Sequence, residues 1–215
     1  MEIADRITVA ERYKALVTSG TIQQDAAQLE LAHALDNVLL QVRERRLTSK
    51  SSALGWLFAS KQKSPALIKG LYIYGSVGRG KTMMMDLFYE QIVAQRKRRV
   101  HFHDFMADVH ERINAQRQAF KRGETKQTDP IVPVAEQLIK EAWVLCFDEF
   151  SVTDITDAMI LSRLFEALFA RGCVLVATSN VRPDDLYRDG LNRSLFEPFI
   201  DLLKTRVDDF NLDAK

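Results

Sequence analysis

The stretch Gly75-Ser76-Val77-Gly78-Arg79-Gly80-Lys81-Thr82 decides the fold of this chain. It matches the pattern Gly-x-x-x-x-Gly-Lys-Ser/Thr of a phosphate-binding loop, in which each fixed position has a physical role. Glycine tolerates a positive φ, so that successive backbone N–H groups can converge on phosphate oxygens. Lys81 adds a point charge against the β- and γ-phosphates, and the hydroxyl of Thr82 is a ligand for Mg²⁺. We therefore expect all eight residues to bind a nucleotide.

The residues on either side of this loop support that prediction. Leu71-Tyr72-Ile73-Tyr74 is rich in strand-forming residues and predicts a buried strand. Residues 82–95 predict a helix, because Met83, Leu87 and Ile92 recur at helical spacing. A bound anion would then lie at a helix N-terminus, where unpaired N–H groups favour it. A glycine-rich turn without a ligand is the alternative, and the strand–loop–helix context argues against it.

Composition narrows the class of protein. The chain has 215 residues, of which 47% are hydrophobic and 27% are charged, as in an ordinary soluble globular protein. The formal net charge of +1 gives no strong signal for a nucleic-acid partner. Cys146 and Cys173 lie in apolar runs without metal-ligand spacing, which predicts buried, reduced thiols in a cytoplasmic protein. The most apolar long stretch, 159–178, contains charged residues, so we expect no transmembrane segment.

Residues 1–60 predict a helical extension that precedes the nucleotide-binding core at 61–215. Asp25 is expected to cap a helix, with Gln28 reaching back to it as in a capping box. One face of this helix is apolar and carries Leu31, Leu35, Val38 and Val42. The helix ends in Arg43, Arg45 and Arg46, which predict a solvated helix end, with RNA or DNA binding as the less favoured alternative. We expect a joint at residues 50–52 and apolar side chains within 54–58 that pack the extension onto the core.

A second strand is predicted at 99–103 and a helix at 105–120. His101, His103 and His110 raise the possibility of a metal site, but no carboxylate or cysteine completes a set at fixed local spacing. Hydrogen-bonded or surface histidines are the favoured interpretation. Residues 121–133 predict an exposed loop, and 134–142 a short helix.

The third strand, 143–147, ends in Asp148-Glu149. An apolar strand that ends in acids, downstream of a phosphate loop, is typical of a Walker B element. Asp148 is expected to hold Mg²⁺, in part through water. Glu149 is expected to orient the attacking water and take its proton. A helix cap is the alternative interpretation of this acidic pair.

Thr153 or Asp154 is expected to cap the next helix, which Gly172 ends, and a fourth strand follows at 173–177. Asn180 comes just after that strand and predicts a sensor that positions the lytic water, with an Asx-turn residue as the alternative. The long separation between Thr82 and Asp148 leaves room for another strand. We therefore expect the strand before Asn180 to lie between the other two, and 207–212 to form a fifth, edge strand. The predicted fold is an α/β P-loop NTPase of AAA+-like type, with a parallel five-stranded sheet sandwiched by helices.

These residues together resemble the AAA+-type ATPases of the ZapE family, which are bacterial cell-division ATPases with mitochondrial relatives. The resemblance covers nearly the whole chain, and its most specific part is the run from Val152 to Met159. It implies an ATPase that binds ATP and Mg²⁺, forms a homo-oligomer and acts on the division protein FtsZ at the division site. It also implies that Arg193 is a finger reaching a neighbouring subunit's ATP site. A surface arginine or a local salt bridge is the alternative for Arg193.

One departure from the family is expected to matter. Family members continue well beyond Phe210, so that the C-terminal lid region is expected to be missing from this chain, which ends at Lys215. ATP turnover is then expected to be weak. Two alternatives follow: a nucleotide-dependent binding or regulatory module, and a DNA-associated AAA+ loader, against which the near-neutral charge counts.

Overall fold

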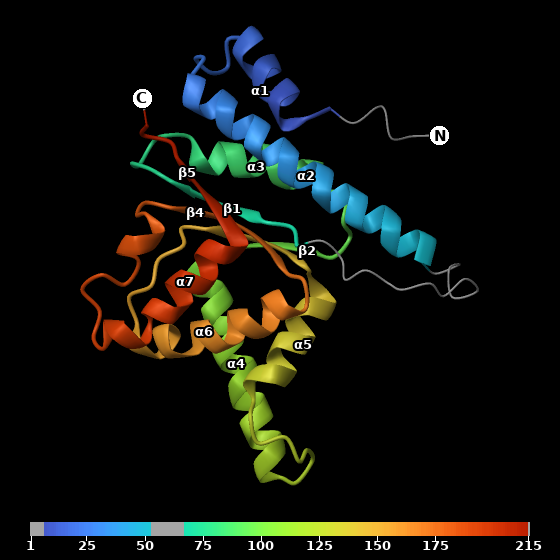
Figure 1. Ribbon diagram of the computed structural model, residues 1–215, viewed down its shortest axis with the longest axis vertical. Coiled ribbons are helices and arrows are strands. Elements are labelled where there is room, and N and C mark those ends of the chain that lie inside the picture. The colour runs from blue at the N-terminus through green and yellow to red at the C-terminus, as the bar shows by residue number, and fades with distance from the viewer. Residues whose placement is uncertain (1–6, 53–66, 215) are drawn as a thin grey trace.

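Five parallel strands form the central sheet, in the order β2 (Lys97–His101), β3 (Val144–Asp148), β4 (Val174–Ser179), β1 (Gly70–Tyr74) and β5 (Val207–Asn211) (Figure 1). The computed structural model describes residues 7–52 and 67–214. All four strand pairings are parallel. β4 lies between β1 and β3, and β5 is an edge strand. Both placements confirm the sequence prediction.

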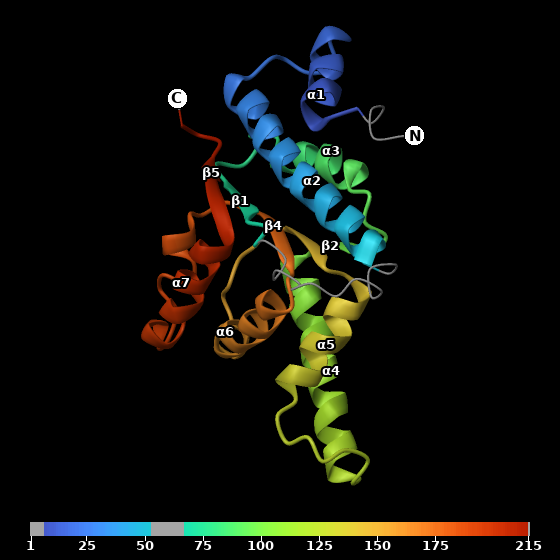
Figure 2. The same ribbon diagram turned by 45° about the vertical axis from the view of Figure 1, so that its right-hand side comes forward.

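Helices connect the strands and cover both faces of the sheet. The α-helices are α1 (Val9–Thr18), α2 (Ala26–Ser52), α3 (Lys81–Gln91), α4 (Phe102–Lys121), α5 (Ile131–Glu141), α6 (Ile155–Ala170) and α7 (Glu197–Arg206). Two 3-10 helices, η2 (Pro183–Asp185) and η3 (Arg193–Leu195), precede α7. Figure 1 shows α1, α2 and α3 on one face and α4 to α7 on the other. Turning the molecule, as in Figure 2, shows α4 beside α5, which in turn contacts α6.

The alternation of side chains along each strand builds two separate hydrophobic layers. In β3, Leu145 and Phe147 point to the face covered by α4 to α7, whereas Val144 and Cys146 point to the face covered by α1 to α3. Because successive side chains of a strand point to opposite faces, a parallel sheet buried on both sides reads as a continuous apolar run. All five residues of β3 are buried. The predicted sandwich of helices around the sheet is confirmed.

The N-terminal helices belong to the second of these layers. Val9 and Tyr13 of α1 and Leu31 and Leu35 of α2 are buried against α3 and the sheet. A capping box between Thr8 and Glu11 begins α1. The boundary predicted near residue 60 and the apolar residues at 54–58 lie outside the described part of the chain, and the division into two domains stays a prediction.

Several predicted boundaries were wrong, for local reasons. β2 begins at Lys97 rather than 99, and its three basic residues are half-buried, as an edge strand allows. α3 ends at Gln91 rather than 95, because Ile92 is already extended. α2 continues through the joint expected at residues 50–52. Asp154 caps α6 as predicted, by accepting from the N–H groups of Thr156 and Asp157.

Both cysteines are free and buried, as predicted. Burial raises the pKa of the Cys173 thiol to about 12, so this thiol is protonated at neutral pH. Among residues 7–52 and 67–214, no helix has both the length and the apolar character needed to cross a membrane.

Candidate nucleotide-binding site

The phosphate loop connects β1 directly to α3. β1 ends at Tyr74 and α3 begins at Lys81, which confirms the predicted strand–loop–helix arrangement. Gly78 and Gly80 both have φ of +84°, a left-handed conformation that side chains with a Cβ rarely adopt. Gly80 is the N-cap of α3 and, as a glycine, has no side chain that could accept from the first N–H groups of the helix. The first N–H groups of α3 therefore face the loop without a capping side chain, as an anion site requires.

Lys81 lies across the loop that precedes it. Its Nζ donates to the carbonyl oxygens of Gly75 at 2.6 Å and Ser76 at 2.8 Å. Burial lowers the pKa of Lys81, while the nearby carboxylates of Asp213 and Glu149 act in the opposite direction. Lys81 thus contacts the loop carbonyls, and the charges of both carboxylates act on its ammonium group.

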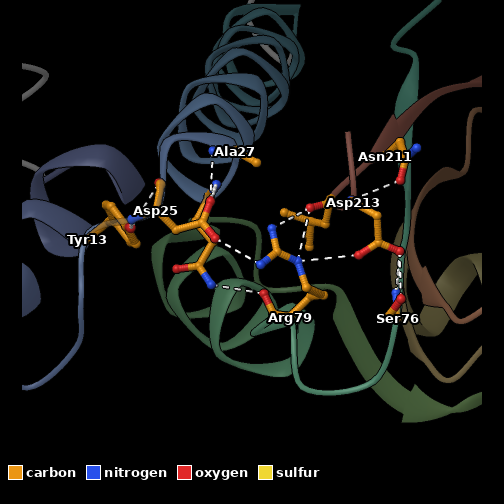
Figure 3. A network of polar contacts seen from close by, with 9 residues as sticks. Tyr13, Asp25, Ala27, Ser76, Arg79, Asn211 and Asp213 are labelled. Carbon is orange, nitrogen blue, oxygen red and sulfur yellow. Dashed lines mark hydrogen bonds and ion pairs between the residues drawn. The ribbon is translucent and has the colours of Figure 1, made fainter. Parts of the chain in front are cut away.

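Arg79 ties the loop to the end of β5. Its guanidinium donates to the carbonyl oxygen of Leu212 from Nε at 3.1 Å and from Nη2 at 2.6 Å (Figure 3). The carboxylate of Asp213 accepts from the N–H of Ser76 at 2.7 Å and from its hydroxyl at 2.8 Å. Asp213 also lies 3.3 Å from Nε of Arg79. The hydrogen bonds from Ser76 lower the pKa of Asp213, which is therefore an anion that occupies loop donors.

The same arginine contacts the start of α2. Asp25 caps this helix by accepting from the N–H groups of Ala27 at 2.9 Å and Gln28 at 3.2 Å, as predicted. Its second oxygen lies 3.1 Å from Nη1 of Arg79. The buried hydroxyl of Tyr13 contacts both the N–H and the carbonyl of Asp25 (Figure 3). The capping box predicted for Gln28 was wrong, because the N–H of Asp25 donates to the hydroxyl of Tyr13 at 2.8 Å; the Gln28 amide donates to the carbonyl of Arg79 at 2.9 Å.

Asp148 ends β3 and is paired with an arginine of β2. Its two carboxylate oxygens lie 2.7 Å and 3.2 Å from nitrogens of Arg99. Arg99 also pairs with Asp86 of α3. Burial acts to lower the pKa of Arg99, but the two carboxylates outweigh it and the net shift is upward. This guanidinium therefore fixes the orientation of Asp148 relative to the first turns of α3.

Glu149 adopts an uncommon backbone conformation beside Asp148. Its φ is +55°, in the left-handed region that a non-glycine residue enters at some cost. Its N–H donates to the hydroxyl of Thr178 at 3.2 Å, and the N–H of Phe150 donates to the carbonyl of Thr178 at 2.7 Å. The Glu149 side chain is exposed, and its charge acts on Lys81. The end of β4 thus holds this turn in a shape that presents the carboxylate at the edge carrying the loop.

The remaining two predicted site residues differ in their placement. Asn180 is exposed and follows the last residue of β4, so that it lies at the sheet edge shared by Gly75 and Glu149. Arg193 lies in η3, where it pairs with Glu197 at 3.0 Å and donates to the carbonyl of Asp184 at 2.6 Å. Its Nε is buried and has no hydrogen-bond partner. Arg193 therefore forms a local salt bridge, which was the alternative to the predicted arginine finger.

Sequence reasoning did not find Asp213, Arg99 or Thr178 as parts of this site. Each acts on a site residue far away along the chain: Asp213 is separated from Ser76 by 137 positions, Arg99 from Asp148 by 49, and Thr178 from Glu149 by 29. No local pattern signals such pairs. These pairs depend on the register of the strand pairing, which the structure supplies.

The oxygen donors at this edge fit Mg²⁺. Thr82 offers a hydroxyl in the first turn of α3 and Asp148 a carboxylate, which are the hard ligands that this ion prefers. Mg²⁺ in phosphate-transfer sites takes one or two protein carboxylates and fills its shell with water and phosphate. In the described part of the chain, no three His, Cys, Asp or Glu side chains form a metal cage. His110 instead contacts Asp157 at 2.6 Å.

A family model for AFG1-like ATPases matches residues 7–215 of the chain. The chain belongs to the AFG1-like ATPase family. It is 42% identical over 214 residues to the cell division protein ZapE of Escherichia coli K12, a match that covers 97% of this chain and 55% of ZapE. It is 52% identical over 149 residues to lactation elevated protein 1 homolog B of Danio rerio, covering 68% of this chain and 30% of that protein. The chain spans about half the length of ZapE and less of the fish protein.

Two solved structures share the fold. DnaI superposes with a TM-score of 0.55 at 12% identity, over 90% of this chain and 88% of its own. The DnaC helicase loader superposes with a TM-score of 0.51 at 15% identity, over 94% of this chain and 98% of its own. The architecture is therefore the P-loop AAA+ fold that the sequence predicts.

We predict that Asp213 restrains the phosphate loop. Substitution Asp213→Ala removes the acceptor of the Ser76 N–H and a partner of Arg79, so that amide hydrogen exchange in residues 75–80 should accelerate severalfold in the nucleotide-free protein. Mass spectrometry of the loop peptide measures this. Asp208→Ala is the matched control, because Asp208 also lies at β5 but pairs with Lys69, at the other end of β1. Equal exchange rates in both variants would contradict the restraint.

Proposed function

We propose that this chain binds ATP with Mg²⁺ at the Gly75–Thr82 loop and hydrolyses it. The observation that carries the proposal is the convergence of Lys81, Asp148 and Glu149 on one edge of a parallel sheet, with Lys81 and Glu149 close enough to interact electrostatically. Membership of the AFG1-like ATPase family supports the same activity.

Each residue has a distinct part in the proposed reaction. The loop N–H groups and Lys81 hold the β- and γ-phosphates, and Thr82 and Asp148 hold Mg²⁺, which neutralises charge on the phosphates when it is bound. Glu149 takes the proton of the attacking water, and Asn180 helps to position that water. Arg99 keeps the Asp148 carboxylate oriented, through the two contacts described above.

Two substitutions separate binding from turnover. Lys81→Ala should abolish ATP binding, because the ammonium group facing the phosphates is lost. Glu149→Gln should keep the affinity for MgATP and lower phosphate release by roughly a hundredfold or more, the usual effect of losing a general base. Calorimetry measures the first effect and a phosphate-release assay the second, with the exposed Lys126→Ala as control.

The outcomes distinguish the alternatives. If ATP bound but wild type and Glu149→Gln released phosphate at the same background rate, the chain would be a nucleotide-dependent binding module. Unchanged ATP affinity in Lys81→Ala would refute the loop assignment itself.

We further propose that the chain assembles into a homo-oligomer in which Arg193 reaches the ATP site of a neighbour. Such a finger stabilises transition-state charge. To do so, Arg193 has to leave Glu197 and the carbonyl of Asp184. Its buried, unpaired Nε supports this, because the local contacts leave part of the guanidinium unsatisfied.

The matched pair Arg193→Ala and Glu197→Gln tests the finger. Arg193→Ala should spare ATP binding and lower turnover by roughly a thousandfold. Glu197→Gln breaks the same ion pair but keeps the guanidinium, and should retain turnover. Phosphate release and light scattering with MgATP measure activity and assembly. If both variants lost turnover equally, or if a strictly monomeric preparation were fully active, Arg193 would have only a structural role.

The similarity to cell division protein ZapE supports a role in division, and we propose FtsZ as the protein acted on, in the cytoplasm at the division site. Sedimentation of purified FtsZ polymers should change when wild-type protein and ATP are added together. With Glu149→Gln and ATP, the amount of sedimented FtsZ should stay unchanged, because this variant is expected to hydrolyse almost no ATP. An unaltered FtsZ pellet with an active wild-type ATPase would reject FtsZ while leaving the ATPase proposal intact.

A further inference from the structure

A cavity lies at the edge of the sheet opposite the phosphate loop. Its volume is about 630 Å³, within the range of small-ligand sites. Its described lining includes one aromatic and five basic side chains: Arg45, Arg46, Arg96, Lys140, Trp143 and Arg171. Arg96 precedes β2, Trp143 precedes β3 and Arg171 precedes β4, so that the cavity faces the amino-terminal ends of these strands. The cavity lies at the start of β3 and Asp148 lies at its end. Since β3 has five residues at about 3.3 Å each, the two are roughly 13 Å apart.

Three of the cations in this cavity have no acidic partner among the described residues. No carboxylate is among its described lining residues. Arg171 pairs with Glu136 at 3.0 Å. No hydrogen bond or ion pair to a described residue occupies the side chains of Arg46, Arg96 or Lys140. Burial lowers the pKa of Arg45, while the nearby Cys173 acts to raise it and the charge of Arg96 to lower it.

Some of these side chains are held in place by the fold. The guanidinium of Arg45 lies 4.6 Å from the ring centroid of Trp143 and donates to the carbonyl of Gly172. Arg171 donates to the carbonyl of Ala167 at 3.0 Å. Arginines oriented in this way are suited to phosphate, which the planar guanidinium binds through two parallel hydrogen bonds. Because the whole chain carries a net charge of only +1, the local excess of positive charge is a feature of this cavity.

We propose that this cavity binds the phosphate groups of a second ligand, distinct from the nucleotide at the Gly75–Thr82 loop. Four arginines, a lysine and an indole supply charge, directed donors and an apolar wall. Arg45 and Arg46 were expected at a solvated helix end, but α2 continues to Ser52, and in this proposal the two side chains have a binding role. A free phosphorylated molecule and the backbone of a nucleic-acid strand share this chemistry, and the test separates them.

The test uses the full chain carrying Lys81→Ala, so that the phosphate loop does not contribute. Calorimetry with inorganic pyrophosphate and, separately, with a single-stranded oligothymidylate should give saturable binding for at least one of them. Arg46→Glu with Lys140→Glu should weaken that binding at least tenfold, because two opposed charges replace two cations. Arg46→Gln with Lys140→Gln, a milder change, should weaken it less and guards against misfolding of the reversed variant, which circular dichroism detects.

The control makes the same charge changes elsewhere. Arg117→Glu with Lys126→Glu alters one exposed arginine and one exposed lysine near the far end of α4, with no ion pair to other described residues. This control should retain binding. Pyrophosphate binding assigns a free phosphorylated ligand, and binding of the oligonucleotide alone assigns a strand. Failure of both ligands to bind, or equal weakening in the control, would overturn the site, and neither result bears on ATP hydrolysis at the loop.

Discussion

The insertion of β4 between β1 and β3 is the constraint on which the rest of the site depends. Parallel pairing places Tyr74 opposite Ser179 and Phe147 opposite Ala177, so that the carboxyl ends of all three strands meet at one edge. With strands about 4.8 Å apart, the phosphate loop and the acidic pair face each other across roughly 10 Å. Backbone hydrogen bonds and two buried apolar layers fix this spacing, and no site residue has to hold it.

Within that frame, residues far away in the sequence control the shape of the loop. Arg79 contacts Asp25 of the α2 cap, the carbonyl of Leu212 and the carboxylate of Asp213. Tyr13 fixes Asp25 in turn, so that a chain of contacts runs from α1 to the loop. The N-terminal helices and the end of β5 are therefore structurally coupled to the phosphate loop. The carboxylate of Asp213 already occupies the Ser76 donors, so that the triphosphate of the proposed function would have to compete with it.

Local patterns predicted the strand–loop–helix arrangement around Gly75–Thr82, the apolar strand that ends in Asp148, the strand order and the Asp154 cap, because each depends on neighbouring residues or on simple spacing. Local patterns failed where a hydrogen-bond partner far away in the sequence replaces a nearby one. Gln28 was expected to reach back to the N–H of Asp25, but that N–H donates to the hydroxyl of Tyr13, and Gln28 donates to the carbonyl of Arg79, 51 positions away. The basic β2 was placed two residues late, since an edge strand keeps charged side chains that a buried strand excludes. The pairs that orient Asp148 and Glu149 depend on strand register, which the sequence does not display.

The central claim is that a triphosphate and its metal bind where β1 turns into α3, opposite the acidic end of β3. A crystal structure with a non-hydrolysable ATP analogue and Mg²⁺ tests it most directly. The account predicts phosphate oxygens within hydrogen-bond distance of Lys81 and the loop N–H groups, and Mg²⁺ near Thr82 and Asp148. An analogue bound elsewhere with this loop empty, or Asp148 and Glu149 directed away from the phosphates, would contradict it.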